Sequence, residues 1–175
     1  MRIRFTRGRG KPDTFTCFRD DGTATWTSLY PGFGAAHDLA HYAVETTLGY
    51  RKAFFGLLAS GRTIQSFEEK DERNRSAHRL EPEAGWSEYL AGALQSEDAG
   101  GYRLDAATML EQMKTHVASR RKVGSAFAAS SPEGVGFTFP EELTDAQLDS
   151  ARALWHELLA RWDAVPPDGH LELEF

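Results

Sequence analysis

Two histidines and a glutamate are spaced four residues apart in the stretch HDLAHYAVE, namely His37, His41 and Glu45. Histidines at positions i and i+4 of a helix can direct both imidazoles at one ion, and helical zinc sites use this spacing. At 100° of rotation per residue, the three side chains follow the edge of the helix face that should pack into the core. Polar groups removed from water at such an edge need partners. The pattern therefore predicts a divalent-metal site of the zinc type, with His37 and His41 as ligands.

Asp38 and Glu45 are the residues expected to support the two histidines, and both are candidates for a catalytic role. A helix that begins near Gly34 places His37 and Asp38 in its first turn, where the helix dipole favours a carboxylate and a neutral imidazole, the form that binds a metal. Asp38 could then orient a ligand or act as a general base. Glu45 lies about 12 Å from His37 along the helix axis, so we expect it to be buried beside His41 and to orient that ring.

A third metal ligand must therefore come from another part of the chain. The nearest supply is the charge-dense segment 67–83, which the sequence predicts to be a short helix followed by a loop. Its candidate ligands are Glu68, Glu69, Asp71 and His78.

Two classes of function fit this helix. In the first, the metal supports hydrolysis by lowering the pKa of a bound water. In the second, the protein is a non-enzymatic binding or interaction module, and Asp38, Glu45 and backbone carbonyls satisfy the two histidines in a structural hydrogen-bond network. The sequence leaves open whether the protein is an enzyme, which small molecule or protein it binds, and its oligomeric state.

Length, charge and composition limit the classes of protein to which this chain can belong. The chain has 175 residues, which predicts one domain over 1–175, and a net charge of −6, which argues against a nucleic-acid binder. The N-terminus has no apolar signal segment, and no apolar run is long enough to span a membrane, so we expect a cytoplasmic protein. Cys17 is the only cysteine. A single cysteine excludes a disulfide within the chain. Cys17 is expected to be a small buried side chain of a strand.

The two ends of the chain are predicted to form one sheet. Residues 1–30 contain IRFTR, TFTCFR and TATWTSL, with Asp21-Gly22 as a hairpin turn, which is typical of a β-meander. HLELEF at 170–175 alternates as well, and its glutamates could pair with Arg2 and Arg4 across two strands. We therefore expect a small antiparallel sheet made of the N-terminal meander and a closing C-terminal strand.

The intervening region, 34–164, is predicted to be helical. One apolar-periodic run extends from Gly34 to Gly61, and GWSEYLAGAL and LDAATMLEQMKTHVASR continue the helical period. Thr144 and Gln147 fit a capping box at the start of the last helix. Residues 125–140 are predicted to be a loop, with a lid as one interpretation. The fold class is thus α+β, with four or five helices packed on the sheet.

Two resemblances are carried by the same helix. The block YPGFGAAHDLAHYAVETTLGYRKAFFGLLASGRTIQ resembles a family of uncharacterised bacterial proteins that have an N-terminal β-meander and an HDLxHxxVE helix. This resemblance covers residues 1–66 and implies an α+β domain without an established activity. His-Asp-x-x-His is also similar to the proposed zinc motif of the ubiquinone-biosynthesis scaffold family. That motif has a glutamate twelve residues after its second histidine, where this chain has Ala53, and the nearest carboxylate here is Glu45.

Overall fold

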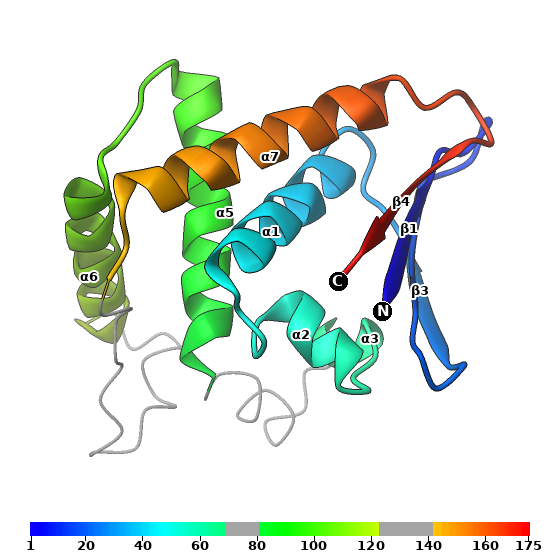
Figure 1. Ribbon diagram of the computed structural model, residues 1–175, viewed down its shortest axis with the longest axis horizontal. Helices are drawn as coiled ribbons and strands as arrows, with labels where there is room; N and C mark the ends of the chain where they lie inside the picture. The colour runs from blue at the N-terminus through cyan, green and yellow to red at the C-terminus, as the bar shows by residue number, and fades with distance from the viewer. Residues whose placement is uncertain (69–80, 123–141) are drawn as a thin grey trace.

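A four-stranded antiparallel sheet brings the two ends of the chain together (Figure 1). The computed structural model describes residues 1–68, 81–122 and 142–175. The strands follow the order β3-β2-β1-β4, so the C-terminal strand lies beside the N-terminal one. Their bounds are β1, Arg2–Thr6; β2, Thr14–Phe18; β3, Ala24–Ser28; and β4, His170–Glu174.

The register of β1 against β4 confirms the predicted pairing of the chain ends. Ile3 lies opposite Leu173 and Phe5 opposite Leu171, and all four side chains are buried on the same face of the sheet. On the other face, the Arg4 guanidinium donates to Glu172, with Nε and Nη2 at 2.8 and 2.6 Å from Oε1. Alternation with a period of two therefore separates the apolar face of this sheet from its charged face.

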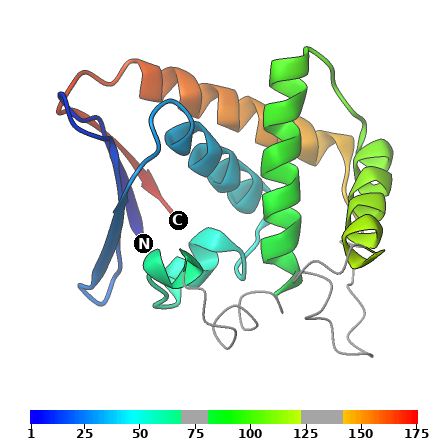
Figure 2. The same cartoon turned by 180° about the vertical axis from the view of Figure 1, so that it is seen from behind.

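Helices lie against the apolar face of the sheet and extend away from it (Figure 2). Helix α1 packs against both α5 and α7, while α6 lies farthest from the sheet. The described parts of the chain contain six helices, which are α1, Gly34–Leu48; α2, Phe54–Ala59; α3, Gln65–Glu68; α5, Pro82–Gly100; α6, Ala106–Lys122; and α7, Asp145–Asp163. This is the α+β class predicted from the sequence. None of these described helices is long and apolar enough to cross a membrane.

The predicted helical run from Gly34 to Gly61 is two helices rather than one. Gly49 ends α1 in the left-handed conformation, with φ of 70°, and the N–H groups of Gly49 and Tyr50 both bond to the carbonyl of Glu45. A glycine that takes this conformation stops a helix at little steric cost. The chain then turns and α2 begins at Phe54, close to the end of α1.

The capping box at the start of α7 is present as predicted. Thr144 Oγ1 accepts from the N–H of Gln147, and Gln147 Oε1 accepts from the N–H of Thr144. The predicted loop 125–140 lies outside the described residues, as does most of the segment 67–83.

Candidate functional site

The crossing of α1 and α5 assembles the candidate site, because it places the two histidines of α1 beside polar side chains of α5. The His41 ring lies between two of them, with Nδ1 at 2.8 Å from Ser87 Oγ and Nε2 at 3.1 Å from Glu88 Oε2. His37 Nδ1 lies 2.9 Å from Gln95 Oε1, and its Nε2 lies 3.9 Å from the same Glu88 oxygen. Both histidines therefore bond through Nδ1 to a positioning side chain and direct Nε2 towards Glu88.

His37, His41 and Glu88 form a possible set of metal ligands. One ligand atom from each lies within 4.8 Å of the other two. The two rings meet edge to face, with centroids 4.8 Å apart, so they approach a common point from different directions. Phe33 stacks on His37 at a centroid distance of 5.4 Å and an interplanar angle of 19°, which restricts rotation of that ring. The structure thus places the predicted pair together and adds a carboxylate from a distant part of the sequence.

The hydrogen bonds fix where the protons of His41 lie. Glu45 Oε1 is 2.9 Å from Ser87 Oγ and accepts the only hydroxyl proton of Ser87. Ser87 must then accept a hydrogen bond from His41, so Nδ1 of His41 carries a proton. Nε2 is left as the nitrogen that can either hold a second proton facing Glu88 or bind an ion. Metal-binding histidines are usually held by a bond of this kind from the non-ligating nitrogen.

Glu45 is fully buried behind His41, as the sequence predicted, and it does not line the pocket described below. Its Oε1 is 3.4 Å from His41 Nδ1. Its two oxygens also accept the backbone N–H groups that begin α2, from Phe54 at 3.1 Å and from Phe55 at 2.9 Å. One carboxyl group therefore connects α1, α2 and α5 and sets the position of His41. Its catalytic role stays a prediction.

Asp38 shares a pocket of about 290 Å³ with the three candidate ligands. It is half-buried, and burial raises the pKa of its carboxyl to about 7, with the charge of His41 opposing this shift and that of Glu88 adding to it. A general base works best when its pKa is near the working pH. Asp38 therefore lies where the sequence suggested a general base, and its catalytic role stays a prediction.

His41 favours its protonated form when no ion is bound. Burial alone lowers its pKa, but the hydrogen bonds and negative charges of Glu45 and Glu88 outweigh burial and raise the pKa from 6.5 to about 9. The two carboxyl groups outweigh burial because each has an oxygen within 3.4 Å of a ring nitrogen of His41, and because Glu45 is fully buried, where little water screens its charge.

We expect the metal-free protein to lose stability as the pH rises from 6.5 through 9. A group whose pKa is higher in the folded state stabilises the fold below its unfolded pKa, and this contribution disappears as the pH passes its folded pKa. The raised pKa of Asp38 has the same effect at lower pH: its contribution to stability is lost as the pH rises from 3.8 through about 7. Urea unfolding across this range would measure the effect, and His41→Gln, which cannot titrate, should flatten the upper part of the profile. An equally steep profile in that variant would contradict this account of His41.

Glu88, the third candidate ligand, was not identified from the sequence. Glu68, Glu69, Asp71 and His78 remain untested as ligands, since the structure does not describe their side chains, and among the described residues Glu88 is the acidic residue that lies with the two histidines. The neighbouring residue Ser87, which is buried, is the one indication of Glu88 that the sequence contains. The buried face of α5 runs through Ser87, Leu90, Ala91 and Leu94. A serine on the buried face of a helix needs a hydrogen-bond partner. The next residue, Glu88, then lies at the edge of that face.

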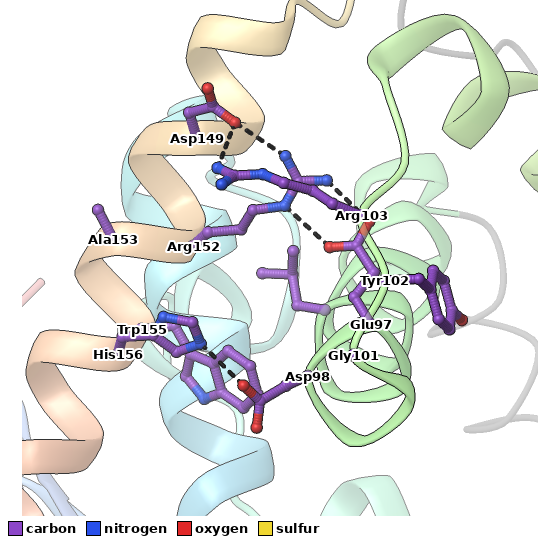
Figure 3. A pocket seen from close by; sticks show the side chains of 11 residues that line it. Glu97, Asp98, Gly101, Tyr102, Arg103, Asp149, Arg152, Ala153, Trp155 and His156 are labelled. Atoms are coloured by element: carbon purple, nitrogen blue, oxygen red, sulfur yellow. Dashed lines mark hydrogen bonds and ion pairs between the residues drawn. The ribbon is translucent and has the colours of Figure 1, made fainter.

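A second pocket, of about 430 Å³, lies between the end of α5 and α7 (Figure 3). Arg152 and Glu97 are both buried there and form two hydrogen bonds, at 2.8 and 2.7 Å. Asp149 bridges Arg152 to Arg103, at 2.9 and 2.6 Å. These charges satisfy one another, so the network links the loop after α5 to α7. We interpret it as structural, because a buried charge is tolerated when it is paired and hydrogen-bonded.

Cys17 is a buried residue of a strand, as the sequence predicted, and two further histidines lie on helices away from the candidate site. Cys17 is buried in β2, and burial raises the pKa of its thiol to about 12, which leaves it a poor nucleophile. His116 is exposed on α6, and His156 is exposed on α7, 3.2 Å from Asp98.

No family model, curated protein or solved structure matches this chain. The two resemblances based on the HDLAHYAVE helix therefore stay predictions, and the functional argument depends on the geometry of the site.

Proposed function

We propose that this chain binds one divalent ion of the zinc type through Nε2 of His37, Nε2 of His41 and a carboxylate oxygen of Glu88, and that it uses the ion for hydrolysis. The observation that carries the proposal is the convergence of these three groups on one pocket. In addition, the Nδ1 atoms of both histidines face side-chain oxygens of α5.

The donor set fits such an ion. Catalytic zinc sites commonly use three protein ligands, two histidines and a glutamate among them, and keep one position open. Ligand atoms around tetrahedral zinc lie about 3.3 Å apart, given bond lengths near 2.0 Å. Here Glu88 Oε2 lies 3.1 Å from His41 Nε2 and 3.9 Å from His37 Nε2, and the exposed side chain of Glu88 can adjust to the ion.

Each residue around the site has a separate role in the proposed hydrolysis. An ion of this kind supplies Lewis acidity, which lowers the pKa of water at the site towards 7. Asp38 lines the same pocket, and its carboxylate can accept a proton from that water. Glu45 and Ser87 hold the His41 ring so that Nε2 faces Glu88. Phe33 holds the His37 ring by stacking.

A second candidate function is supported by the completeness of the metal-free network. Each ring nitrogen of His41 already lies within hydrogen-bond distance of a described partner, and Glu45 accepts three hydrogen bonds. A non-enzymatic binding module could use this network to fix the crossing of α1 and α5. In that case the histidines need no ion.

Zinc stoichiometry separates the two candidates. After loading with zinc and exhaustive dialysis, elemental analysis should find about one equivalent in the wild type. Glu88→Gln and His37→Ala should each lower zinc affinity at least tenfold, since each removes one of three ligands. His156→Ala, which removes an exposed histidine that is also paired with an acid, is the matched control and should bind as the wild type does.

Two results would overturn the proposed metal site. One is a wild type that retains no zinc after loading. The other is zinc that stays bound, with unchanged affinity, in both Glu88→Gln and His37→Ala. Circular dichroism of each variant establishes that it is folded, and Glu88 is the safer of the two changes because its side chain is 68% exposed.

A further inference from the structure

The pocket beside the candidate ligands is lined by apolar groups as well as by polar ones. Four of its lining residues are those already assigned to binding the ion and transferring protons. The remaining three lining residues are apolar, and they are Phe54, Phe67 and Ala84. At about 290 Å³ the pocket is at the small end of the range for ligand sites, about 300–1,000 Å³.

The two phenylalanine rings form a fixed wall. Phe54 contacts Phe67 at a centroid distance of 5.1 Å, and its ring lies 6.0 Å from that of His41. On the sheet side, Phe54 stacks on Phe15 of β2, which is fully buried. Its backbone N–H is held by Glu45, the same carboxyl that positions His41. The aromatic wall and the candidate metal ligands are therefore positioned by shared contacts.

Ala84 leaves space in this pocket. It lies on α5 one helical turn before Glu88, so the two residues share one side of that helix. A larger side chain at position 84 would enter the pocket without removing any candidate ligand. This gives a way to fill the apolar part of the pocket separately from the ion.

We propose that the pocket binds an aromatic ring of the substrate, placed against Phe54 and Phe67 next to the bond that is hydrolysed. The proposal rests on the metal site proposed above and specifies the class of its substrate. Aromatic rings favour edge-to-face or offset contacts with ring centroids about 4.5–7 Å apart. Two phenylalanines within 5.1 Å of each other offer such contacts to a third ring.

A pair of small chelators tests the proposal. Acetohydroxamate and benzohydroxamate carry the same zinc-binding group and differ only in a methyl or a phenyl substituent. Titration calorimetry with zinc-loaded protein should show benzohydroxamate binding about 10- to 100-fold more tightly, after correction for the ratio on free zinc, because it buries a phenyl ring. Ala84→Leu should abolish this preference while retaining zinc. Ala153→Leu, an exposed alanine that lines the second pocket, is the matched control and should keep the preference.

The outcomes distinguish this proposal from the one on which it rests. Loss of zinc from the wild type would remove both. Zinc binding with equal affinity for the two chelators would leave the metal site intact and overturn the aromatic pocket, as would a preference that survives in Ala84→Leu. If Ala84→Leu does not fold, Phe67→Ala removes half of the aromatic wall instead, and the preference for benzohydroxamate should then be lost in that variant.

Discussion

Deleting residues 170–175 is expected to remove most of the stability of this protein. The deletion takes away Leu171 and Leu173, which are buried against β1, and Phe175, whose ring lies 5.6 Å from that of the buried Phe55. Each fully buried side chain of this size contributes about 1.5–3 kcal/mol. The sum approaches the whole free energy of unfolding of a small domain, about 5–15 kcal/mol.

The loss is larger than the deleted side chains alone because β1 becomes an edge strand. Ile3 and Phe5, both fully buried, would lose the cover of their cross-strand partners. The backbone bond from Phe175 to Met1, at 2.9 Å, and the bond from the Tyr42 hydroxyl to Glu174, at 2.6 Å, would also be lost. Thermal unfolding followed by circular dichroism measures the effect.

Glu172→Gln is the matched control for that deletion. It changes only the charged face of β4, where Glu172 pairs with Arg4 and both side chains are about one-third exposed. Ion pairs at such exposed positions contribute about 0–1 kcal/mol, so the melting temperature should move by only a few degrees. A truncated protein that melts within a degree or two of the full-length chain would contradict the role assigned to β4.

The sheet could be predicted from the sequence because its signals are local. Alternation in RIRFT and in HLELE assigns each side chain to one face, and the opposite charges of Arg4 and Glu172 select the pairing. The same holds for the start of α7, where the capping box lies within four consecutive residues. Each of these signals concerns residues that are neighbours in sequence or that share a simple parity.

The candidate site could be predicted only in part, because half of it depends on how two helices cross. His37 and His41 were identified from their spacing, and Glu45 was correctly expected to be buried beside His41. Glu88 lies 47 residues after His41, and only the crossing of α1 and α5 brings them together. The break at Gly49 also turns the chain back so that α2 begins against Glu45, which a continuous helix would have prevented.

Glu45→Gln is expected to destabilise the protein and to weaken zinc binding, because both oxygens of Glu45 accept backbone N–H groups. Oε1 accepts from Phe54 and Oε2 from Phe55, and Ser87 donates to Oε1 as well. A glutamine has one oxygen, so in either orientation its amide N–H₂ faces a backbone donor in a fully buried position. A buried donor without an acceptor costs about 1–3 kcal/mol. For a domain of this size, the melting temperature should fall by about 2–12 °C.

Zinc affinity should fall in the same variant, by the 10- to 100-fold that is typical when a group orienting a metal ligand is changed. Glu83→Gln is the matched control. Glu83 also accepts two backbone N–H groups, from Arg51 and Lys52, at 2.7 and 2.6 Å, but both reach the single oxygen Oε2. A glutamine can turn its one oxygen to that position, so Glu83→Gln should keep both the melting temperature and the zinc affinity. Equal behaviour of the two variants would contradict the role of Glu45 in positioning His41, whereas loss of stability with unchanged zinc affinity would limit Glu45 to capping α2.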